Sequence, residues 1–311
     1  MITIWMVTLL TTAVGIGTAP DAASPARASA VVRQQSGAAG YWTPPRMRAA
    51  MRNAWSDGDS LGSALRWEHG GAVARMTGKV FFTLDGTDYV CSGAAVGGDV
   101  VLTAAHCTGN GAGDWAANWT FVPGYAGGTA PYGSFAARRF YVPPQWAAQR
   151  GASSVKAEKY DVAFVTVNPS RPAGHGGQGR GPVRGGTGAR RLGQVTRGLA
   201  VAFGSTPLNG RDTYVFGYPS VPPFSGQYPD FCAGRARQTA KDIANGAAAI
   251  TCGMTAGDSG GPWITGFSPR TGAGVVVAVS TYKYSDGARM LYGTRLGREA
   301  ERLYVAASAA G

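Results

Sequence analysis

The sequence predicts an all-β fold, either a barrel or a sandwich, and two observations support this prediction. The 311 residues include 48 glycines, while only 15% of the residues are charged. This composition suits tight turns between strands better than it suits a helical bundle. Short apolar and β-branched runs alternate with turn signals along most of the chain, and helical periodicity is almost absent.

The strand pattern begins near Val73. A first strand over 79–84 runs into Asp85-Gly86, a dipeptide that favours a β-hairpin turn. The other expected strands are equally short and apolar: 89–91, 94–96, 100–102, 161–167, 199–203, 213–216 and 274–279. Residues 172–189 contain eight glycines, which predicts a surface loop between two halves of the domain. Only the C-terminal stretch has the pattern of a helix.

The N-terminal region is interpreted as two leader segments. Residues 4–17 form an apolar run and Ala28-Ser29-Ala30 fits a small-x-small cleavage site, so 1–30 is expected to be a signal peptide. No Lys or Arg precedes the run. The run is too short to span a bilayer comfortably, so no stable membrane anchor is expected. Residues 31–72 are polar, rich in Arg, Ala and Gly and without a strand pattern, which predicts a pro-segment or a flexible extension.

Charge and cysteine content narrow the function classes. The net charge of +12 is carried almost entirely by Arg, but these residues are scattered and no basic stripe interleaves with aromatics, so nucleic-acid binding is not favoured. Four cysteines, Cys91, Cys107, Cys232 and Cys252, form an even set, which in an exported chain predicts two disulfides. Three pairings are possible, and we expect the local pairs Cys91–Cys107 and Cys232–Cys252. The three histidines lack metal-ligand spacing, so neither a metal nor another cofactor is expected.

Two short sequence strings contain the candidate catalytic residues. Leu102-Thr103-Ala104-Ala105-His106-Cys107 places a histidine directly after an apolar strand, and Gly257-Asp258-Ser259-Gly260-Gly261-Pro262 places a serine between glycines. A nucleophilic serine needs a general base within hydrogen-bond reach and an acid that orients this base. It also needs backbone N–H groups directed at the developing oxyanion, and glycines permit the tight turn that presents them.

With the spacing of Cys91 and Cys107, these strings resemble the chymotrypsin/trypsin family of serine peptidases over about residues 73–305. Within that family the sequence is most similar to bacterial secreted members related to the staphylococcal glutamyl endopeptidase, through the strings 121–125 and 216–219. The resemblance implies two packed six-stranded antiparallel β-barrels, over about 73–190 and 191–297, followed by a short helix at about 298–307. It also implies a secreted, monomeric peptidase of polypeptide substrates, with the site in the cleft between the barrels.

The resemblance assigns a role to each residue of the two strings. His106 would act as general base and then acid, Ser259 as the acylated nucleophile, and the N–H groups of Gly257 and Ser259 as the oxyanion hole. Family members place the orienting acid at the start of an apolar strand between the histidine and the serine, where this chain has Asp161.

Two other carboxylates fit that position poorly, because Asp99 precedes the histidine and Asp114 follows it too closely. Asp258 would pair with a newly cut N-terminal amine in a trypsin-like zymogen, and a cut near Arg75 could supply that amine. An internal Arg could be its partner instead.

The resemblance places a substrate pocket at Gly253, Met254, Ser280, Thr281 and Tyr282. Gly253 stands where tryptic enzymes carry Asp, so cleavage after Lys or Arg is disfavoured because a buried cation would lack a partner. Tyr282 replaces a Gly of roomy pockets, and Val279 stands where glutamyl endopeptidases carry His. A small or apolar residue is therefore expected before the scissile bond.

Other functions remain open at this point. The same triad could serve an esterase or a highly restricted processing peptidase. A non-catalytic binding protein could be built on the same scaffold, although such proteins usually lose a triad residue or the oxyanion glycine. A polyanion-binding protein would use the basic loops rather than the cleft.

Overall fold

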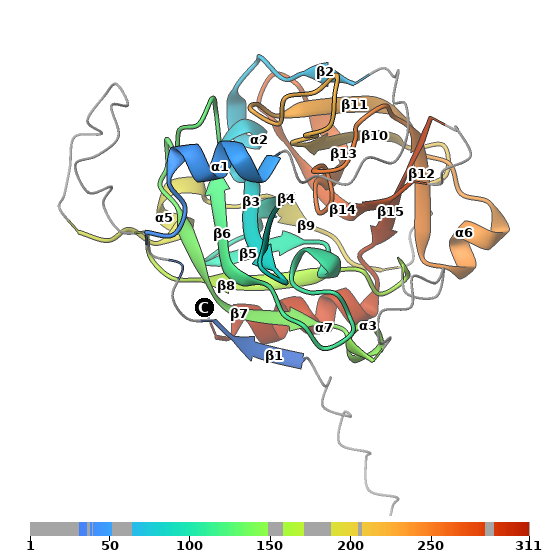
Figure 1. The fold of residues 1–311 in the computed structure, drawn as a ribbon. Helices are drawn as coiled ribbons and strands as arrows, with labels where there is room; N and C mark the ends of the chain where they lie inside the picture. Colours follow the sequence, from blue (N-terminus) through green and yellow to red (C-terminus); the bar gives the residue numbers. More distant parts are fainter. Residues whose placement is uncertain are drawn as a thin grey trace, which may run out of the picture.

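The computed structural model of the protein describes residues 31–35, 38, 40–51, 64–148, 158–170, 188–204, 207–283 and 289–310. The expected signal peptide and nearly all of the glycine-rich loop therefore lie outside the described residues. The described chain forms two antiparallel β-sheets, each curled on itself, with a C-terminal helix packed against the first (Figure 1). This is the fold that the sequence predicted.

The first sheet closes into a six-stranded barrel. Its strands are β3 (Thr77–Leu84), β4 (Thr87–Ala95), β5 (Val100–Thr103), β6 (Ala117–Pro123), β7 (Phe135–Val142) and β8 (Ala163–Val167). They are ordered β7-β6-β3-β4-β5-β8, and pairing of β7 with β8 closes the barrel. The predicted hairpin joins β3 to β4, and Asp85 and Gly86 both have positive φ, as a type I′ turn requires.

The second sheet is curled but less completely closed. Its strands are β10 (Asp212–Gly217), β11 (Asp230–Arg235), β12 (Ala247–Thr251), β13 (Pro262–Ser268), β14 (Ala273–Tyr282) and β15 (Met290–Arg295). They are ordered β12-β15-β14-β13-β10-β11, and the short β9 (Ala200–Val201) pairs parallel to β14. Beyond the end of β11, an isolated bridge between Arg237 and Ala249 brings the chain back to β12.

The region 31–72 contains strands and helices that the sequence analysis did not predict. Strand β1 (Val31–Gln34) pairs antiparallel with β7, and β2 (Leu65–Arg66) pairs with β11. Helix α1 (Pro44–Ala50) begins with Thr43 as N-cap and a proline in its first turn, where the missing N–H costs nothing. Helix α2 (Gly71–Met76) then leads directly into β3. The described parts of this region thus pack onto both sheets.

Short helices connect the strands, and one longer helix ends the chain. The short ones are η2 (Ala105–Cys107), α3 (Pro144–Ala147), α5 (Leu192–Thr196) and α6 (Ala240–Ala244). Helix α7 (Arg298–Ser308) buries Ala300, Leu303 and Ala307, one face of a 3.6-residue repeat, against β7 and β8. None of the helices in the described residues is both long and apolar enough to cross a membrane.

Apolar side chains from both sheets meet in one shared core. Trp67 packs edge-on against Phe216, Phe231 and Phe267, with ring centroids 5.2–5.5 Å apart. The same core contains Leu102 of the first sheet. Because buried apolar area is the main source of folding free energy, this shared core fixes the two sheets against each other and hence the residues at their junction.

Candidate active site

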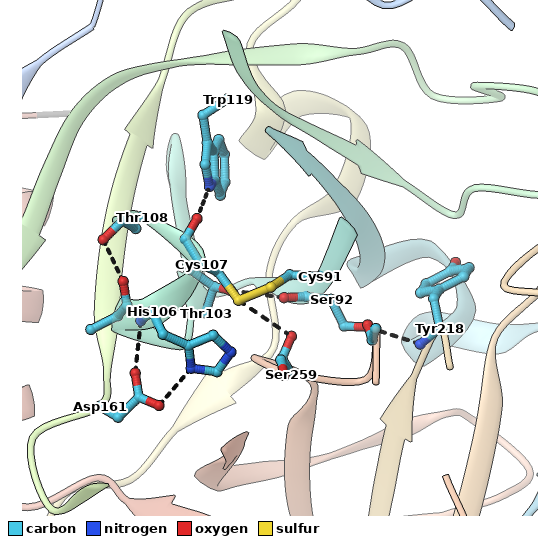
Figure 2. The surroundings of a disulfide bond; sticks show 12 residues. Cys91, Ser92, Thr103, His106, Cys107, Thr108, Trp119, Asp161, Tyr218 and Ser259 are labelled. Atoms are coloured by element: carbon cyan, nitrogen blue, oxygen red, sulfur yellow. Dashed lines mark hydrogen bonds and ion pairs between the residues drawn. A yellow bond between two sulfur atoms is a disulfide. The ribbon is translucent and has the colours of Figure 1, made fainter. Parts of the chain in front are cut away.

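His106 lies in the single turn η2 that follows β5. All four residues of β5 are buried, so the strand fixes the start of this turn in the barrel. The disulfide Cys91–Cys107 then ties the residue after the histidine to β4. The indole Nε1–H of Trp119 donates to the Cys107 carbonyl over 3.0 Å (Figure 2). The histidine is therefore held from three directions while its side chain stays partly exposed.

Asp161 reaches His106 because β5 and β8 are antiparallel neighbours. Thr103 at the end of β5 pairs with Ala163 at the start of β8, which brings the residues just beyond these two positions to the same end of the barrel. Asp161 Oδ1 accepts the backbone N–H of His106 at 2.8 Å, and Oδ2 lies 2.7 Å from the imidazole Nδ1. Asp161 as a whole is only 5% exposed.

These contacts set the protonation behaviour of the imidazole. Burial would lower the pKa of His106, but the charge and hydrogen bond of Asp161, with a smaller contribution from the charge of Asp258, outweigh it and raise this pKa above its ordinary 6.5. A nearby negative charge favours the imidazolium. The Asp161 contact also directs Nδ1 away from solvent, and Figure 2 shows the far side of the ring directed toward Ser259.

Ser259 lies in a tight turn between β12 and β13. Gly257 and Gly260 have φ of +102° and +80°, a region that glycine adopts without strain. A Cβ on Gly260 would come within 2.2 Å of Thr103 Oγ1 and 2.4 Å of the Ser92 carbonyl. Glycine is therefore needed at this point for conformation and for space.

Ser92 fastens this turn to the first barrel. Its backbone N–H donates to the Ser259 carbonyl at 2.7 Å, and its hydroxyl donates to the Gly257 carbonyl at 2.8 Å. The same hydroxyl accepts the N–H of Tyr218 at 2.8 Å (Figure 2). Ser92 follows Cys91, so one short piece of β4 positions both the histidine turn and the serine turn.

The N–H groups of Gly257 and Ser259 donate to no acceptor within the described residues. Most backbone N–H groups in a folded protein are paired, so two N–H groups without an acceptor in one turn can serve a bound oxyanion. Within the same residues, the Ser259 hydroxyl also makes no hydrogen bond, and Ser259 is partly exposed. The serine is thus accessible, while its hydrogen bond with His106 is not formed in this state.

Asp258 is a buried carboxylate beside the site. Burial raises its pKa to about 7, against the opposing effects of the Lys283 charge, a hydrogen bond from Ser280 and the His106 charge. Its Oδ2 has no hydrogen-bond partner within the described residues. Among the positive charges that oppose the effect of burial, that of Lys283 acts most strongly. Pairing of Asp258 with a newly cut amino terminus or with an internal Arg stays a prediction.

Of the expected pocket residues, Ser280 contacts the serine turn directly. Gly253 and Met254 are buried, and Ser280 of β14 exchanges backbone hydrogen bonds with Gly260 and Gly261 at 2.8 and 2.9 Å. Thr281 follows Ser280, and its hydroxyl bonds that of Thr294 at 2.9 Å. The ring of Tyr282 is stacked on that of Tyr292, with centroids 4.9 Å apart and planes 6° apart.

The second disulfide joins Cys232 of β11 to Cys252, directly before Gly253, which the sequence analysis expected in the pocket. The local pairing expected from the sequence is therefore present in both bridges. Cys91, His106 and Cys107 are the only group in the described part of the chain whose ligand atoms are close enough for a metal ion. Since the two sulfurs are bonded to each other, they do not supply thiolate ligands.

Sequence reasoning missed the interior contacts of three residues near the site: Lys79, Ser92 and Ser220. Lys79 was assigned to a strand but not to the interior, and the two serines lie in no motif. The proximity of Ser92 to Cys91 could have indicated it. Ser220 had no signal, since its partners Lys79 and Ala256 are distant in sequence.

Comparison with known proteins places these observations in context. A family model described as the trypsin-like peptidase domain matches residues 91–268. Among curated proteins, the extracellular metalloprotease of Bacillus subtilis (strain 168) is 32% identical over 82 residues. This match covers 26% of the chain and about a quarter, 24%, of the relative's length.

Solved structures match over much more of the chain. The protease Anisep from Arthrobacter nicotinovorans is 34% identical, with a TM-score of 0.62, over 76% of this chain and 96% of its own. The thermostable serine protease AL20 from an extremophilic microorganism is 28% identical, with a TM-score of 0.63, over 77% and 100%. A Glu endopeptidase is 20% identical, with a TM-score of 0.58, over 81% and 98%, and this likeness concerns the fold alone.

Proposed function

The chain belongs to the trypsin-like peptidase family, and from this premise we propose that it is a secreted serine endopeptidase with His106, Asp161 and Ser259 as its catalytic triad. The observation that carries the proposal is the double contact of Asp161, which holds both the backbone and the imidazole of His106. The remaining ring nitrogen is directed toward the serine turn (Figure 2). A base oriented in this way is the central requirement for activating a serine.

The reaction proceeds in two halves. Nε2 of His106 takes the Ser259 proton while Oγ bonds to the carbonyl carbon of the scissile peptide, and the Asp161 charge stabilises the imidazolium. The imidazolium then gives its proton to the leaving amine as the C–N bond breaks, which leaves an acyl-enzyme. A water molecule, deprotonated by His106, attacks the acyl carbon, and Ser259 recovers its proton as the acid product leaves.

The N–H groups of Gly257 and Ser259 stabilise the negative oxygen formed in each half. Their lack of an acceptor in the described residues supports this role, because donors already in place need no reorganisation during the reaction. The missing Ser259–His106 hydrogen bond is consistent with it, since such bonds often tighten only when substrate is bound.

Substrate preference is the second part of the proposal. Tyr282 of β14 lies opposite Tyr292 of β15 at the expected pocket, and the two rings are stacked. Their rings therefore reduce the room for a large substrate side chain. We expect a small or apolar residue before the scissile bond. A cleavage profile from a peptide library that is dominated by Lys, Arg or Glu would overturn this expectation.

Secretion is supported by the two disulfides, which persist in oxidising compartments. The name of the Bacillus subtilis relative also describes an extracellular protein. Cleavage of residues 1–30 as a signal peptide and processing near Arg75 stay predictions. Amino-terminal sequencing of the protein recovered from culture medium would test both.

Labelling with a fluorophosphonate probe tests the triad and separates the peptidase from a binding protein on the same scaffold. We expect the wild type and the control Ser308→Ala, an exposed serine of helix α7, to be labelled and Ser259→Ala to stay unlabelled. A folded wild type that takes no label favours the binding protein. Mass spectrometry of casein fragments then distinguishes internal cleavage from removal of terminal residues.

A further inference from the structure

Lys79 is the one lysine that lies fully buried in the described residues. It stands in β3, where it pairs with Ser92 on one side and Val122 on the other, and it has no exposed surface. Its ammonium lies 5.7–5.9 Å from the ring centroids of Phe81, Tyr125 and Tyr218. Burial lowers the pKa of Lys79 well below its ordinary value. Burying such a group is costly, so its contacts call for an explanation.

The Lys79 amino group joins the two ends of one loop. Nζ donates to Ser220 Oγ at 3.0 Å and to the Gly226 carbonyl at 2.7 Å. Both acceptors belong to the segment 218–229 between β10 and β11. No carboxylate forms an ion pair with Lys79 in the described part of the chain. The lysine therefore closes the loop by hydrogen bonds alone.

The same loop also holds the serine turn, whose Gly257 and Ser259 N–H groups form the proposed oxyanion hole. The N–H of Ser220 donates to the Ala256 carbonyl at 2.8 Å, and Val221 exchanges hydrogen bonds with Thr255 Oγ1 at 3.0 and 3.1 Å. Ser220 also packs directly on Gly257, because a Cβ added there would come within 2.7 Å of Ser220 Oγ. The peptide before Gly257 is thus held by the residue that accepts the Lys79 hydrogen bond.

We infer that Lys79 is a positioning residue, whose amino group holds the loop 218–229 and through it the N–H of Gly257 in the direction of the oxyanion. A lysine amine can donate to two acceptors at once, whereas an apolar side chain of similar length would fill the space without joining the two ends. This inference rests on the proposed function, because it assigns a role in the same oxyanion hole. Lys79 touches no reacting atom.

The test compares Lys79→Met with a core variant, Val165→Ala, which removes buried volume in the first barrel, and thermal unfolding measures the stability that each variant loses. The rate of Ser259 labelling by the fluorophosphonate probe reports on the oxyanion hole, since labelling creates an oxyanion-like oxygen. We expect Lys79→Met to slow labelling and to lower kcat for casein hydrolysis by about 10²-fold, with KM nearly unchanged. Val165→Ala should keep the wild-type rates despite its loss of thermal stability.

A second variant keeps the test valid if Lys79→Met fails to fold. Ser220→Ala removes one acceptor and should slow labelling by about 10-fold. Where both variants fold, the double variant should lose no more than Lys79→Met alone, because contacting residues in one network are not additive. Equal rates for Lys79→Met and Val165→Ala, a loss confined to KM, or a Ser220→Ala variant with the wild-type rate would overturn the inference. An unlabelled, folded wild type would instead overturn the proposed function.

Discussion

Replacing Asp161 by Asn tests the orienting role of this residue with little change in shape. The Asn carbonyl oxygen can still accept the backbone N–H of His106, so that its amide NH₂ meets Nδ1 in place of Oδ2. The imidazole must then accept a hydrogen bond at Nδ1, which places its single proton on Nε2. The nitrogen directed toward Ser259 therefore can no longer accept the serine proton.

The size of the effect follows from the contact. Oδ2 and Nδ1 lie 2.7 Å apart, which places the centres of the carboxylate and imidazolium charges roughly 4 Å apart. At an effective dielectric constant of about 20, this attraction amounts to about 4 kcal/mol, or about 10³-fold in rate. Since the wrong tautomer adds to this loss, we expect kcat to fall by about 10³–10⁴-fold.

The assay is single-turnover labelling of Ser259, followed in parallel with thermal unfolding. Asp99→Asn is the matched control, because Asp99 is equally buried in the first barrel and pairs with Arg191 at 2.6 Å. This control should lose stability but keep its labelling rate. An Asp161→Asn variant that keeps more than about a tenth of the wild-type rate, or an Asp99→Asn variant that loses as much, would refute the reasoning.

Three further predictions concern the turn, the bridge and the buried carboxyl. Gly257→Ala should lower kcat by about 10²-fold, because its Cβ would strain a residue at φ +102° and press on Ser220; steady-state kinetics measures this, and an unchanged kcat contradicts it. Replacing both Cys91 and Cys107 by Ser should lower the free energy of unfolding in urea by roughly 3 kcal/mol, as expected for a loop of 16 residues; a loss well under 1 kcal/mol would argue against the bridge. Because burial raises the pKa of Asp258 from 3.8 to about 7, the carboxyl stabilises the fold below pH 4 and loses this effect as the pH rises to 7. The free energy of unfolding of the wild type should therefore fall by up to about 4 kcal/mol between pH 4 and pH 7 because of this group, and Asp258→Asn should remove that fall. A variant whose pH profile runs parallel to that of the wild type would contradict this.

The sequence predicted the parts of the fold whose signals are local. The hairpin at Asp85-Gly86 and helix α7 depend on neighbouring residues, and the structure confirms both. Strand β1 was missed because Arg33 and Gln34 are polar and exposed, and its partner β7 lies more than 100 residues away. Helix α1 could have been found, since Thr43 followed by Pro44 is a recognisable helix start.

The residues of the candidate site fall into the same two groups, those with a local sequence signal and those without one. His106 and Ser259 lie in strings that carry their own chemistry, and Asp161 was inferred from its place before an apolar strand. The burial of Lys79 depends on Ser220 and Gly226, which follow it by 141 and 147 residues. No local pattern predicts a buried lysine, because lysine is among the residues least often buried. Only the folded chain brings these three residues together.

The contacts of strand β7 affect the order in which the chain can fold during synthesis. The strand is paired on one side by β1, from the start of the described chain, and covered by α7, from its end (Figure 1). The guanidinium of Arg138 in β7 reaches the Ala310 carbonyl at 2.6 Å. A chain emerging from a ribosome folds from its N-terminus as it lengthens, yet this barrel lacks its last covering element until residue 310 has emerged. The growing chain can therefore complete the packing of the first barrel, which holds His106 and Asp161, only after the whole second sheet and α7 have been made.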